Sequence, residues 1–379
     1  MTEMPIPTPG TPSPQPEAIV GRSLWQDAWI RLRRNRAAVA SALVLAFLGL
    51  VGIFGPMLSP HDYTRVYPQF VRAPASLEPY PRADVVIPSF ERTMARARIE
   101  GAPVLENGTV SVRIEDEDPI DDRILRYFQR SDLFINPRLD LAPDGLSGTL
   151  SADVEQLYFL FGTDAVGRDL MSRIFIGVRI SLAIGLLASA MALLLGVTYG
   201  AISGYLGGRV DNVMMRIVDV LYSLPFIFFV ILLVVFFGRN LVIIFIAIGA
   251  TEWLDMARIV RGQTLSLKRQ EFVQAAEALG ATRAGILMRH VVPNTLGPVI
   301  VFVTLLVPKA ILLESLLSFL GLGVQEPLTS LGLLISEGAA NMRGAPWLLI
   351  WPALTLTAIL FALNFLGDGL RDSLDPKDR

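Results

Sequence analysis

Two long stretches without a charged residue constrain this fold more than any other feature of the sequence. Residues 37–58 and 180–208 contain only uncharged side chains, most of them apolar. About 20 such residues in a helix cross the hydrocarbon core of a bilayer. We therefore predict a first transmembrane helix at residues 37–58 and a second within 180–208.

Further apolar stretches follow in the second half of the chain. They are residues 220–238, 241–259, 294–321 and 344–367. The sequence is 52% hydrophobic and only 18% charged, a composition typical of integral membrane proteins. We predict an all-α membrane protein with six transmembrane helices. Pro225 lies inside the third helix, which we expect to bend there.

The charges that flank the first helix predict its orientation. Arginines are concentrated just before it, at positions 22, 31, 33, 34 and 36. Positively charged flanks favour the cytoplasmic side, and six crossings return the C-terminus to that side. Residues 1–36 are expected to form a Pro-rich disordered tail followed by this basic leader.

Residues 59–160 separate the first two helices and are too polar to cross a bilayer, so they predict an extracytoplasmic insert. Asn107-Gly108 between alternating residues predicts a β-hairpin, because both residues accept positive φ angles. Another strand is expected near residues 85–90. The acidic run at 115–118 predicts a solvated face, since it lacks the glycine that a Ca²⁺ loop requires. The insert should therefore be mixed and partly β.

Besides Arg258, four charged residues lie inside the predicted membrane helices. Glu252 and Asp255 belong to the fourth helix, and Lys309 and Glu314 to the fifth. Charges at membrane depth usually pair and face a bundle interior or a wet cavity, so all four are candidates for lining a transport pathway. For Asp255 a local pair with Arg258 at the membrane boundary is the alternative.

Residues 271–293 form a polar interruption between the fourth and fifth helices. An apolar stripe at helical spacing predicts a short helix there, and Glu271, Gln274 and Glu277 lie off this stripe. The stripe consists of Phe272, Ala275, Ala276 and Leu279. Gly280 permits a sharp turn, Thr282 can cap a second helix, and Pro293 marks the start of a new element. A helix this short needs a surface to pack against, and the surrounding basic residues place it in the cytoplasm.

Several functional classes have little or no support in the sequence. There is no cysteine, and His61 and His290 are the only histidines. The sequence therefore offers few side chains for a Cys- or His-based metal site or for a catalytic triad. A membrane hydrolase would need a base at membrane depth, where neither histidine is expected. The phosphate-binding pattern Gly-x-x-x-x-Gly-Lys-Ser/Thr does not occur. We expect no catalytic residue, no bound cofactor or metal, and no nucleic-acid partner.

The stretch 271–293 resembles the cytoplasmic coupling loop of the permeases of ABC importers. Ala275, Ala276, Gly280 and Pro293 match the family pattern. Three residues depart from it: Gln274 replaces the usual Glu, His290 the usual Ile and Val292 the usual Leu. The resemblance implies that Glu271 and Glu277 are the acidic contacts of an ATPase-docking surface. Its residues would be Glu271, Phe272, Gln274, Ala275, Ala276, Glu277, Leu279, Gly280 and Pro293.

Three further stretches resemble the second, C-type permease subunit of dipeptide, oligopeptide and nickel importers. They are Phe161-Gly-Thr-Asp-x-x-Gly-Arg-Asp169, Gly204-Tyr-Leu-Gly-Gly-Arg-Val-Asp211 and Ser318-Phe-Leu-Gly-Leu-Gly-Val-Gln325. The resemblance covers residues 24–57 and 161–375 and leaves out the insert. It implies a type I importer permease domain at 161–379, with a coupling loop at 263–293.

The resemblance also implies partners and a location. The chain would sit in a bacterial inner membrane and pair with a homologous permease, two ATPases that bind ATP and Mg²⁺, and a periplasmic solute-binding protein. Peptides are the expected substrate, and nickel or another small solute is the alternative. An ion-coupled secondary transporter that uses the four intramembrane charges is the alternative from another class.

Overall fold

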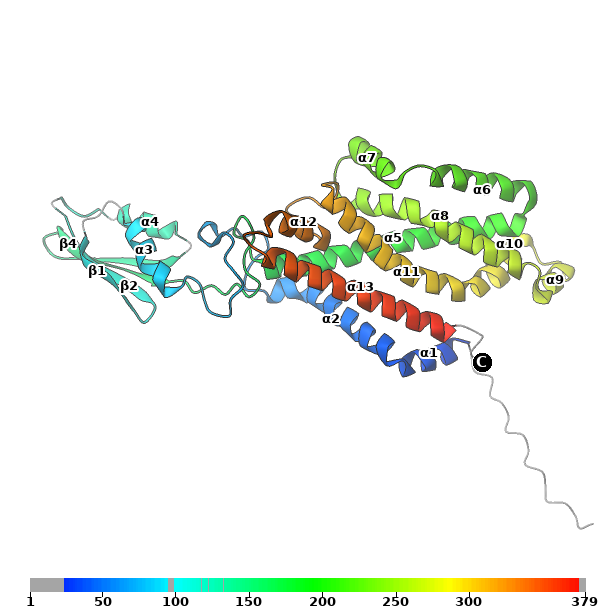
Figure 1. Cartoon of the computed structure of the whole chain (residues 1–379), viewed down its shortest axis with the longest axis horizontal. Helices are drawn as coiled ribbons and strands as arrows, with labels where there is room; N and C mark the ends of the chain where they lie inside the picture. The colour runs from blue at the N-terminus through cyan, green and yellow to red at the C-terminus, as the bar shows by residue number, and fades with distance from the viewer. Residues whose placement is uncertain (1–23, 95–98, 117, 122, 132, 375–379) are drawn as a thin grey trace, which may run out of the picture.

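The computed structural model describes residues 24–94, 99–116, 118–121, 123–131 and 133–374. The predicted disordered tail lies outside these residues. Figure 1 shows an elongated molecule with a helical bundle at one end and a small sheet domain, the insert, at the other. Helices α2 (Arg36–Leu58) and α13 (Trp347–Leu374) run side by side from the basic leader helix α1 (Leu24–Arg34) toward the insert.

The remaining long helices complete the bundle. They are α5 (Leu170–Leu206), α8 (Leu241–Leu267) and α11 (Val292–Phe319). Four helical segments are long and apolar enough to cross a membrane: α2, α5, Arg283–Phe319 and α13. Helix α8 coincides with the fourth predicted crossing, but the charges in its second half keep it outside that apolar group. The predicted membrane bundle is thus confirmed.

The third predicted crossing is not one straight helix. Helix α6 (Gly208–Tyr222) ends before Pro225, and α7 (Phe226–Phe237) continues at an angle of 82°. Proline lacks an N–H and disfavours helical geometry in the residue before it, which explains the break. If the bent pair counts as one crossing, five segments meet the length and apolarity requirement.

Glycines on α5 allow it to pack closely against α8. A Cβ atom at Gly196 would lie 2.4 Å from Met256 Cγ, and one at Gly200 would lie 2.4 Å from the carbonyl oxygen of Ala257. At Gly204 the nearest atom is the carbonyl oxygen of Arg261, at 2.9 Å. The four-residue spacing places these glycines on one face, as in close-packed membrane helices. This contact gives a physical reason for the glycine that opens the 204–211 stretch.

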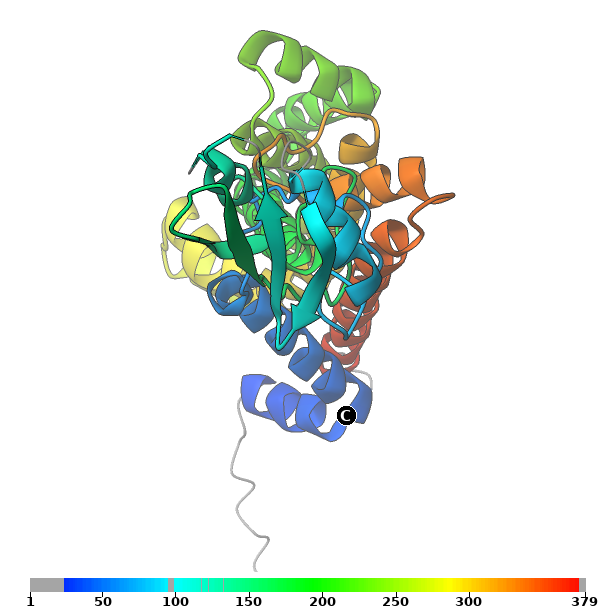
Figure 2. The ribbon, with the colours of Figure 1, turned by 90° about the vertical axis from the view of Figure 1, so that its left-hand side faces the viewer.

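The insert contains a four-stranded antiparallel sheet with the order β1-β2-β4-β3. The strands are β1 (Ile99–Glu106), β2 (Thr109–Glu115), β3 (Phe134–Leu141) and β4 (Ser147–Val154). The predicted β-hairpin is confirmed, with positive φ angles of 50° at Asn107 and 81° at Gly108. Figure 2 looks along the length of the molecule, with the sheet in front of the bundle.

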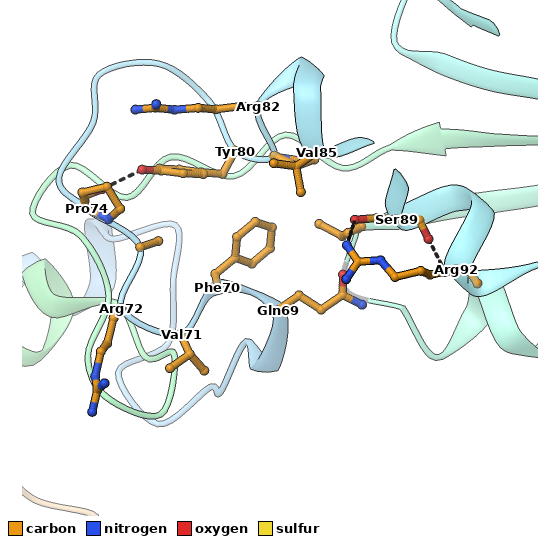
Figure 3. A pocket seen from close by; sticks show the side chains of 14 residues that line it. Gln69, Phe70, Val71, Arg72, Pro74, Tyr80, Arg82, Val85, Ser89 and Arg92 are labelled. Carbon is orange, nitrogen blue, oxygen red and sulfur yellow. Dashed lines mark hydrogen bonds between the residues drawn. The ribbon is translucent and has the colours of Figure 1, made fainter. Parts of the chain in front are cut away.

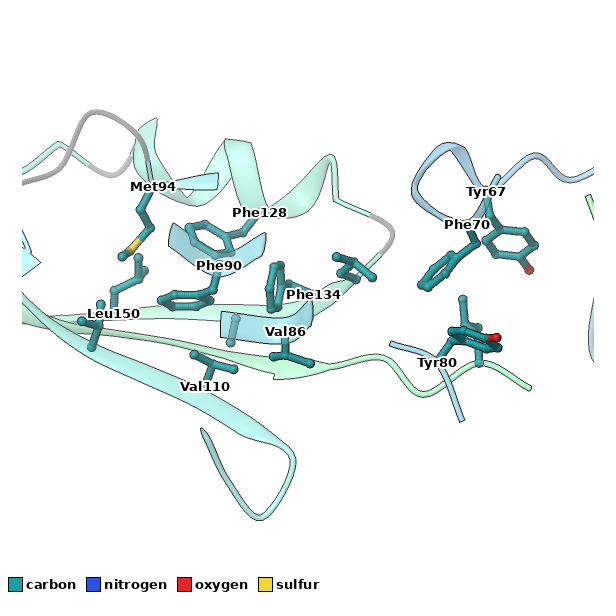
Figure 4. Packing of buried hydrophobic residues seen from close by; sticks show 14 of the residues in the cluster. Tyr67, Phe70, Tyr80, Val86, Phe90, Met94, Val110, Phe128, Phe134 and Leu150 are labelled. Atoms are coloured by element: carbon teal, nitrogen blue, oxygen red, sulfur yellow. The ribbon is translucent and has the colours of Figure 1, made fainter. Parts of the chain in front are cut away.

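Two helices pack against one face of the sheet, and one of them corrects a prediction. Residues 85–90, expected as a strand, belong to helix α3 (Ala83–Thr93). Val86, Phe90 and Met94 recur every four residues and are buried, which is a helical rather than a strand period. Helix α4 (Arg123–Gln129) adds Phe128 to the same core. Figure 4 shows these side chains stacked over the sheet, beside a second aromatic group around the short 3-10 helix Pro68–Phe70.

Candidate functional site: the two ends of the bundle

The loop 271–293 folds as a helix, a turn and a second helix, as predicted. Helix α9 (Glu271–Ala278) is followed by a turn at Gly280, whose φ is +81°. The Gly280 N–H donates to the Glu277 carbonyl at 3.0 Å. Thr282 then caps α10 (Arg283–Ile286) by accepting from the Gly285 N–H at 3.2 Å. Figure 1 places α9 at the end of the molecule farthest from the insert.

The apolar residues of α9 lie on two faces of the helix, one buried and one exposed. Val273 and Ala276 are buried against Tyr205 at the end of α5 and against Ile286 and Val291. The sequence prediction placed Ala276 with the docking residues and did not single out Val273. Their spacing of three puts both on the side that closes against the bundle.

The exposed face of α9 carries Phe272, Ala275 and Leu279, which we call the docking stripe. Phe272 is 42% exposed and Leu279 is 88% exposed, and Ala275 between them is also exposed. Their i, i+3, i+7 spacing aligns them on one side of the helix. A rigidly held helix therefore presents a short apolar stripe to the surroundings.

Polar contacts on α9 distinguish the two predicted acidic residues. Glu277 Oε1 accepts a hydrogen bond from the Tyr205 hydroxyl at 3.2 Å, and Tyr205 is held in turn by Lys268, which donates to its carbonyl. Gln274 donates to the Arg269 carbonyl at 3.3 Å. Glu271 is exposed, and its side chain has no hydrogen bond or ion pair within the described part of the chain. Glu277 thus anchors α9 to α5, and Glu271 is the acid left available.

Pro293 lies in the first turn of α11, where its missing N–H breaks no required helical bond. A short π-helical turn, Leu287–Val291, precedes it and joins α10 to α11 in one helical segment, Arg283–Phe319. Helix α11 begins one residue before Pro293, but it continues the preceding π-helical turn without a break, so the chain does not start a separate element there. Through this segment α9 is connected directly to a membrane-crossing helix.

Three of the four intramembrane charges meet between α8 and α11. Lys309 Nζ lies 2.8 Å from Glu252 Oε2 and 3.2 Å from Asp255 Oδ2. Glu252 is buried, whereas the Lys309 side chain is 48% exposed. The expectation that charges at membrane depth pair is thus confirmed for Lys309, whose partners lie on another helix.

Beside this cluster lies a cavity of about 430 Å³. Asp255, Lys309 and Phe302 line it, together with Arg258, Ile259, Leu305 and Leu306. The alternative local pair of Asp255 with Arg258 is not formed, because Arg258 pairs with Asp219 of α6 at 2.9 Å. The two acids of α8 therefore share Lys309, at the wall of a cavity.

Glu314 does not join that cluster. It is fully buried and accepts from the hydroxyl of Ser318 at 2.6 Å and from that of Ser181 on α5 at 3.3 Å. Ser181 in turn accepts from the Leu331 N–H at 3.1 Å. A Cβ atom at Gly323 would lie 1.9 Å from Ser318 Oγ, so only glycine fits there. The stretch 318–325 thus folds back over a carboxyl that links α5, α11 and the start of α12 (Leu331–Asn341).

The stretch 161–169 forms the junction between the insert and the bundle. Asp164 accepts hydrogen bonds from the backbone N–H groups of Val166 and Arg168, both at 2.9 Å, and from Arg168 Nε at 2.7 Å. Gly167 has a φ of +92°, and a Cβ atom there would lie 2.2 Å from the Tyr67 carbonyl oxygen. Asp169 caps α5 by accepting from the Ser172 N–H at 2.8 Å. These contacts explain the residue spacing in this stretch.

A buried arginine completes the junction. Arg173 Nη1 lies 2.6 Å from Asp164 Oδ2 and 2.6 Å from Glu337 Oε2, and its side chain is 2% exposed. Burial raises the pKa of the Asp164 carboxyl, but Arg173 and the N–H donors around it outweigh burial and hold the pKa below its ordinary value. Nothing in the sequence except the spacing of acids and arginines indicated this network.

No group of three or more His, Asp or Glu side chains that could hold a metal ion occurs in the part of the chain that the structure describes. The acidic run 115–118 has one residue, Glu117, outside that part. Asp121 nearby pairs with Arg123 at 3.1 Å, and both side chains are exposed.

The fold is that of a membrane protein whose helical bundle ends in an exposed apolar helix, and comparisons with known proteins place it in a family of membrane transport proteins. The family model described as binding-protein-dependent transport system inner membrane component matches residues 196–379. The model for the N-terminal transmembrane domain of oligopeptide transport permease C matches residues 23–79.

Curated relatives extend the match over nearly the whole chain. The oligopeptide transport system permease protein OppC of Escherichia coli K12 is 46% identical over 95% of this chain and 94% of its own length. OppC of Haemophilus influenzae is 44% identical over 95% and 90%, and the dipeptide permease DppC of Bacillus subtilis is 36% identical over 94% and 87%. A solved structure of the MetNI methionine ABC transporter has 16% identity and a TM-score of 0.46, covering 52% of this chain and 94% of its own.

The chain therefore belongs to the family of binding-protein-dependent ABC transport permeases, in the group of the C-type oligopeptide and dipeptide permeases. The relatives cover 95% of the chain, so the similarity includes most of the insert. This corrects the expectation that the resemblance stops at the insert. Membership in this family also favours an importer permease over the ion-coupled carrier.

Proposed function

We propose that this permease imports short peptides across a bacterial inner membrane, with ATP hydrolysed by separate subunits. The observation that carries the proposal is the docking stripe on a helix that is otherwise fastened to the bundle. Its relatives are named as oligopeptide and dipeptide permeases. The partners would be a second permease, two ATPases that bind ATP and Mg²⁺, and an extracytoplasmic solute-binding protein. Both termini would be cytoplasmic, and the insert 59–160 would face outward.

In this proposal α9 transmits force between the ATPase and the membrane helices. A groove of the ATPase covers Phe272, Ala275 and Leu279, and Glu271 supplies a polar contact at the edge. Val273 and Ala276, packed on the opposite side, pass the displacement to α5, and the continuous segment Arg283–Phe319 passes it to α11. Tightly packed contacts move together rather than deform, so the bundle tilts as a unit.

The cluster of Lys309, Glu252 and Asp255 is proposed to line the transport pathway. It combines a half-exposed ammonium group with two carboxylates beside a cavity, a set that can meet either end of a zwitterionic peptide. We assign Glu314 a different role. Its carboxyl accepts hydrogen bonds from the hydroxyls of Ser318 and Ser181, and Ser181 also binds the Leu331 N–H, so these contacts hold three elements of the bundle together.

The test is a comparison of two arginine substitutions in the same loop. Ala275→Arg places a long charged side chain in the docking stripe, and Ala284→Arg places the same group on the exposed side of α10. We expect Ala275→Arg to abolish co-purification of the ATPases and peptide uptake, with membrane insertion intact. Ala284→Arg should retain both. Wild-type ATPase recovery and uptake with Ala275→Arg would refute the assignment.

Ala276→Arg is a less specific probe, because Ala276 is buried and the substitution would displace α9 from the bundle. Gly280→Pro would likewise disturb the turn, since proline cannot adopt a positive φ. Both are expected to abolish docking, but through loss of the helix position.

A further inference from the structure

A well-formed cavity lies in the insert, where the chain leaves the 3-10 helix Pro68–Phe70 and enters α3. Its volume is about 580 Å³, within the range of small-molecule sites. The rings of Phe70 and Tyr80 form its floor and are almost fully buried. Figure 3 shows both rings between Arg82 on one side and Arg92 on the other.

The charge of this cavity is one-sided. Three arginines line it, Arg72, Arg82 and Arg92, and no Asp or Glu among the residues that the structure describes does. Arg72 donates to Asn341 of α12 at 2.9 Å and points away from the floor. Arg82 stands 5.9 Å from the centre of the Tyr80 ring. None of the three forms an ion pair with an acid in the described part of the chain.

Arg92 is held in place by neutral groups. Its Nε donates to the Pro88 carbonyl at 3.1 Å, and its Nη2 donates to the Ser89 hydroxyl at 3.1 Å. Guanidinium carries five N–H donors, so these two bonds leave three for a ligand. A fixed guanidinium fork binds a planar carboxylate with two parallel hydrogen bonds. The amide of Gln69 lines the same side and adds a polar group.

We propose that this cavity, which we call the arginine pocket, binds the carboxylate end of a short peptide. The α-carboxylate meets Arg92 beside Gln69, and the last side chain lies on Phe70 and Tyr80, with Val85 at the rim. Arg82 closes the far side and adds positive potential. The choice of a peptide rests on the proposed function, whereas the need for a carboxylate attached to an apolar group rests on the pocket alone.

A site of this kind would lie on the outward part of the permease, away from the cluster of Lys309, Glu252 and Asp255. A peptide held there by one end would be close to the pathway before it enters. This role differs from that of a docking surface, because a cavity with a buried aromatic floor encloses a single side chain.

The experiment measures peptide binding by the full-length chain in nanodiscs of zwitterionic lipid. The probe is the tripeptide Ala-Ala-Phe, used as the free acid and as its C-terminal amide. The free acid should bind, and the amide should bind at least about tenfold more weakly, as expected when a charge-assisted hydrogen bond is lost. Equal affinity for acid and amide, or no binding of the acid at millimolar concentration, would overturn the proposal.

Variants assign the binding to this pocket. Arg92→Gln should weaken binding of the free acid by about tenfold or more and leave binding of the amide unchanged. Arg126→Gln, on the exposed side of α4, is the matched control and should bind as the wild type does. Val85→Trp should block binding of both peptides by filling the rim. Thermal unfolding of each variant shows whether the insert is intact, and wild-type affinity in Arg92→Gln would contradict the assignment.

The outcome is separable from the proposed function. Ala275→Arg should keep the peptide affinity while it loses the ATPases. Arg92→Gln should keep the ATPases. If Arg92→Gln alone binds as the wild type does, the pocket assignment fails and the docking stripe is untouched.

Discussion

The junction at 161–173 and helix α9 lie at opposite ends of the bundle and differ in the side chains that they bury and expose. At the junction the chain closes on itself, so Asp164 and Arg173 are buried and paired. At α9 the apolar side chains of Phe272 and Leu279 are exposed, and we propose that a partner subunit covers them. A region that packs only within the chain can bury charged side chains as ion pairs. A region that binds another protein exposes apolar side chains before the two associate.

Glycines show the same contrast. Gly167 and Gly280 both have positive φ angles, +92° and +81°. A Cβ atom at Gly167 would meet the Tyr67 backbone at 2.2 Å, but one at Gly280 would have no atom within 4 Å. Gly167 is therefore required by conformation and contact together, and Gly280 by conformation alone.

The largest effect is expected from breaking the buried ion pair at the junction. Arg173→Ala leaves Glu337 without its cation and Asp164 with Arg168 alone, and loss of one partner of a buried pair costs about 3–5 kcal/mol of unfolding free energy. The exposed pair Arg123 and Asp121 is the control, where Arg123→Ala should cost about 0–1 kcal/mol. Thermal and denaturant unfolding in detergent measures the stability of both variants. Equal losses of unfolding free energy in Arg173→Ala and Arg123→Ala would contradict the contrast between a buried and an exposed ion pair.

The next largest loss of stability is expected from replacing Gly167 or Gly280 by alanine. Gly280→Ala should cost about 1–2 kcal/mol, the penalty for a left-handed residue with a Cβ. Gly167→Ala should cost clearly more, because the Tyr67 backbone must also move. The same unfolding measurements apply, and an equal cost at both sites would show that the close contact at Gly167 does not matter.

A smaller effect is expected at the intramembrane cluster, where Lys309 is half exposed. Lys309→Met should destabilise the bundle by about 1–3 kcal/mol, between the values for exposed and buried pairs, and should reduce peptide uptake. Adding Glu252→Gln to Lys309→Met should recover part of the stability, because fewer buried charges then lack a partner. Independent, additive losses in this double-mutant cycle would mean that the two residues do not interact.

The smallest expected effect is the change with pH in the contribution of Asp164 to stability. The pKa of Asp164 is lower in the folded chain than the ordinary value of about 3.9, so its stabilising contribution is present above about pH 4. As the pH falls through the folded pKa, the carboxyl becomes protonated and this contribution is lost. Asp164→Asn should therefore be less stable than the wild type at pH 7, with a smaller difference at pH 3. A difference that does not change with pH would contradict the ion-pair account.

Some features of the fold follow from local sequence patterns alone. The uncharged stretches predicted the membrane helices, Asn107-Gly108 predicted the β-hairpin, and Gly280 with Thr282 predicted the turn after α9. Each of these is determined by residues that are close in sequence.

The features that sequence reasoning missed depend on contacts between distant segments. Periodicity grouped Ala276 with Ala275, but only the position of Tyr205 decides that Ala276 faces inward. The spacing in 161–169 had no explanation until Tyr67 and Arg173 were placed beside it. The same holds for Lys309, because the sequence alone did not identify Glu252 and Asp255 of α8 as its partners.

The most direct test of the central claim is a cross-link from the docking stripe. The chain contains no cysteine, so Leu279→Cys provides a single attachment point for a photoreactive thiol reagent. In the purified complex, light should join this position to an ATPase subunit, and the same reagent on Ala284→Cys should not. Cross-linking from Ala284 alone, or from neither position in a complex that still hydrolyses ATP, would contradict the assignment of α9 as the docking helix.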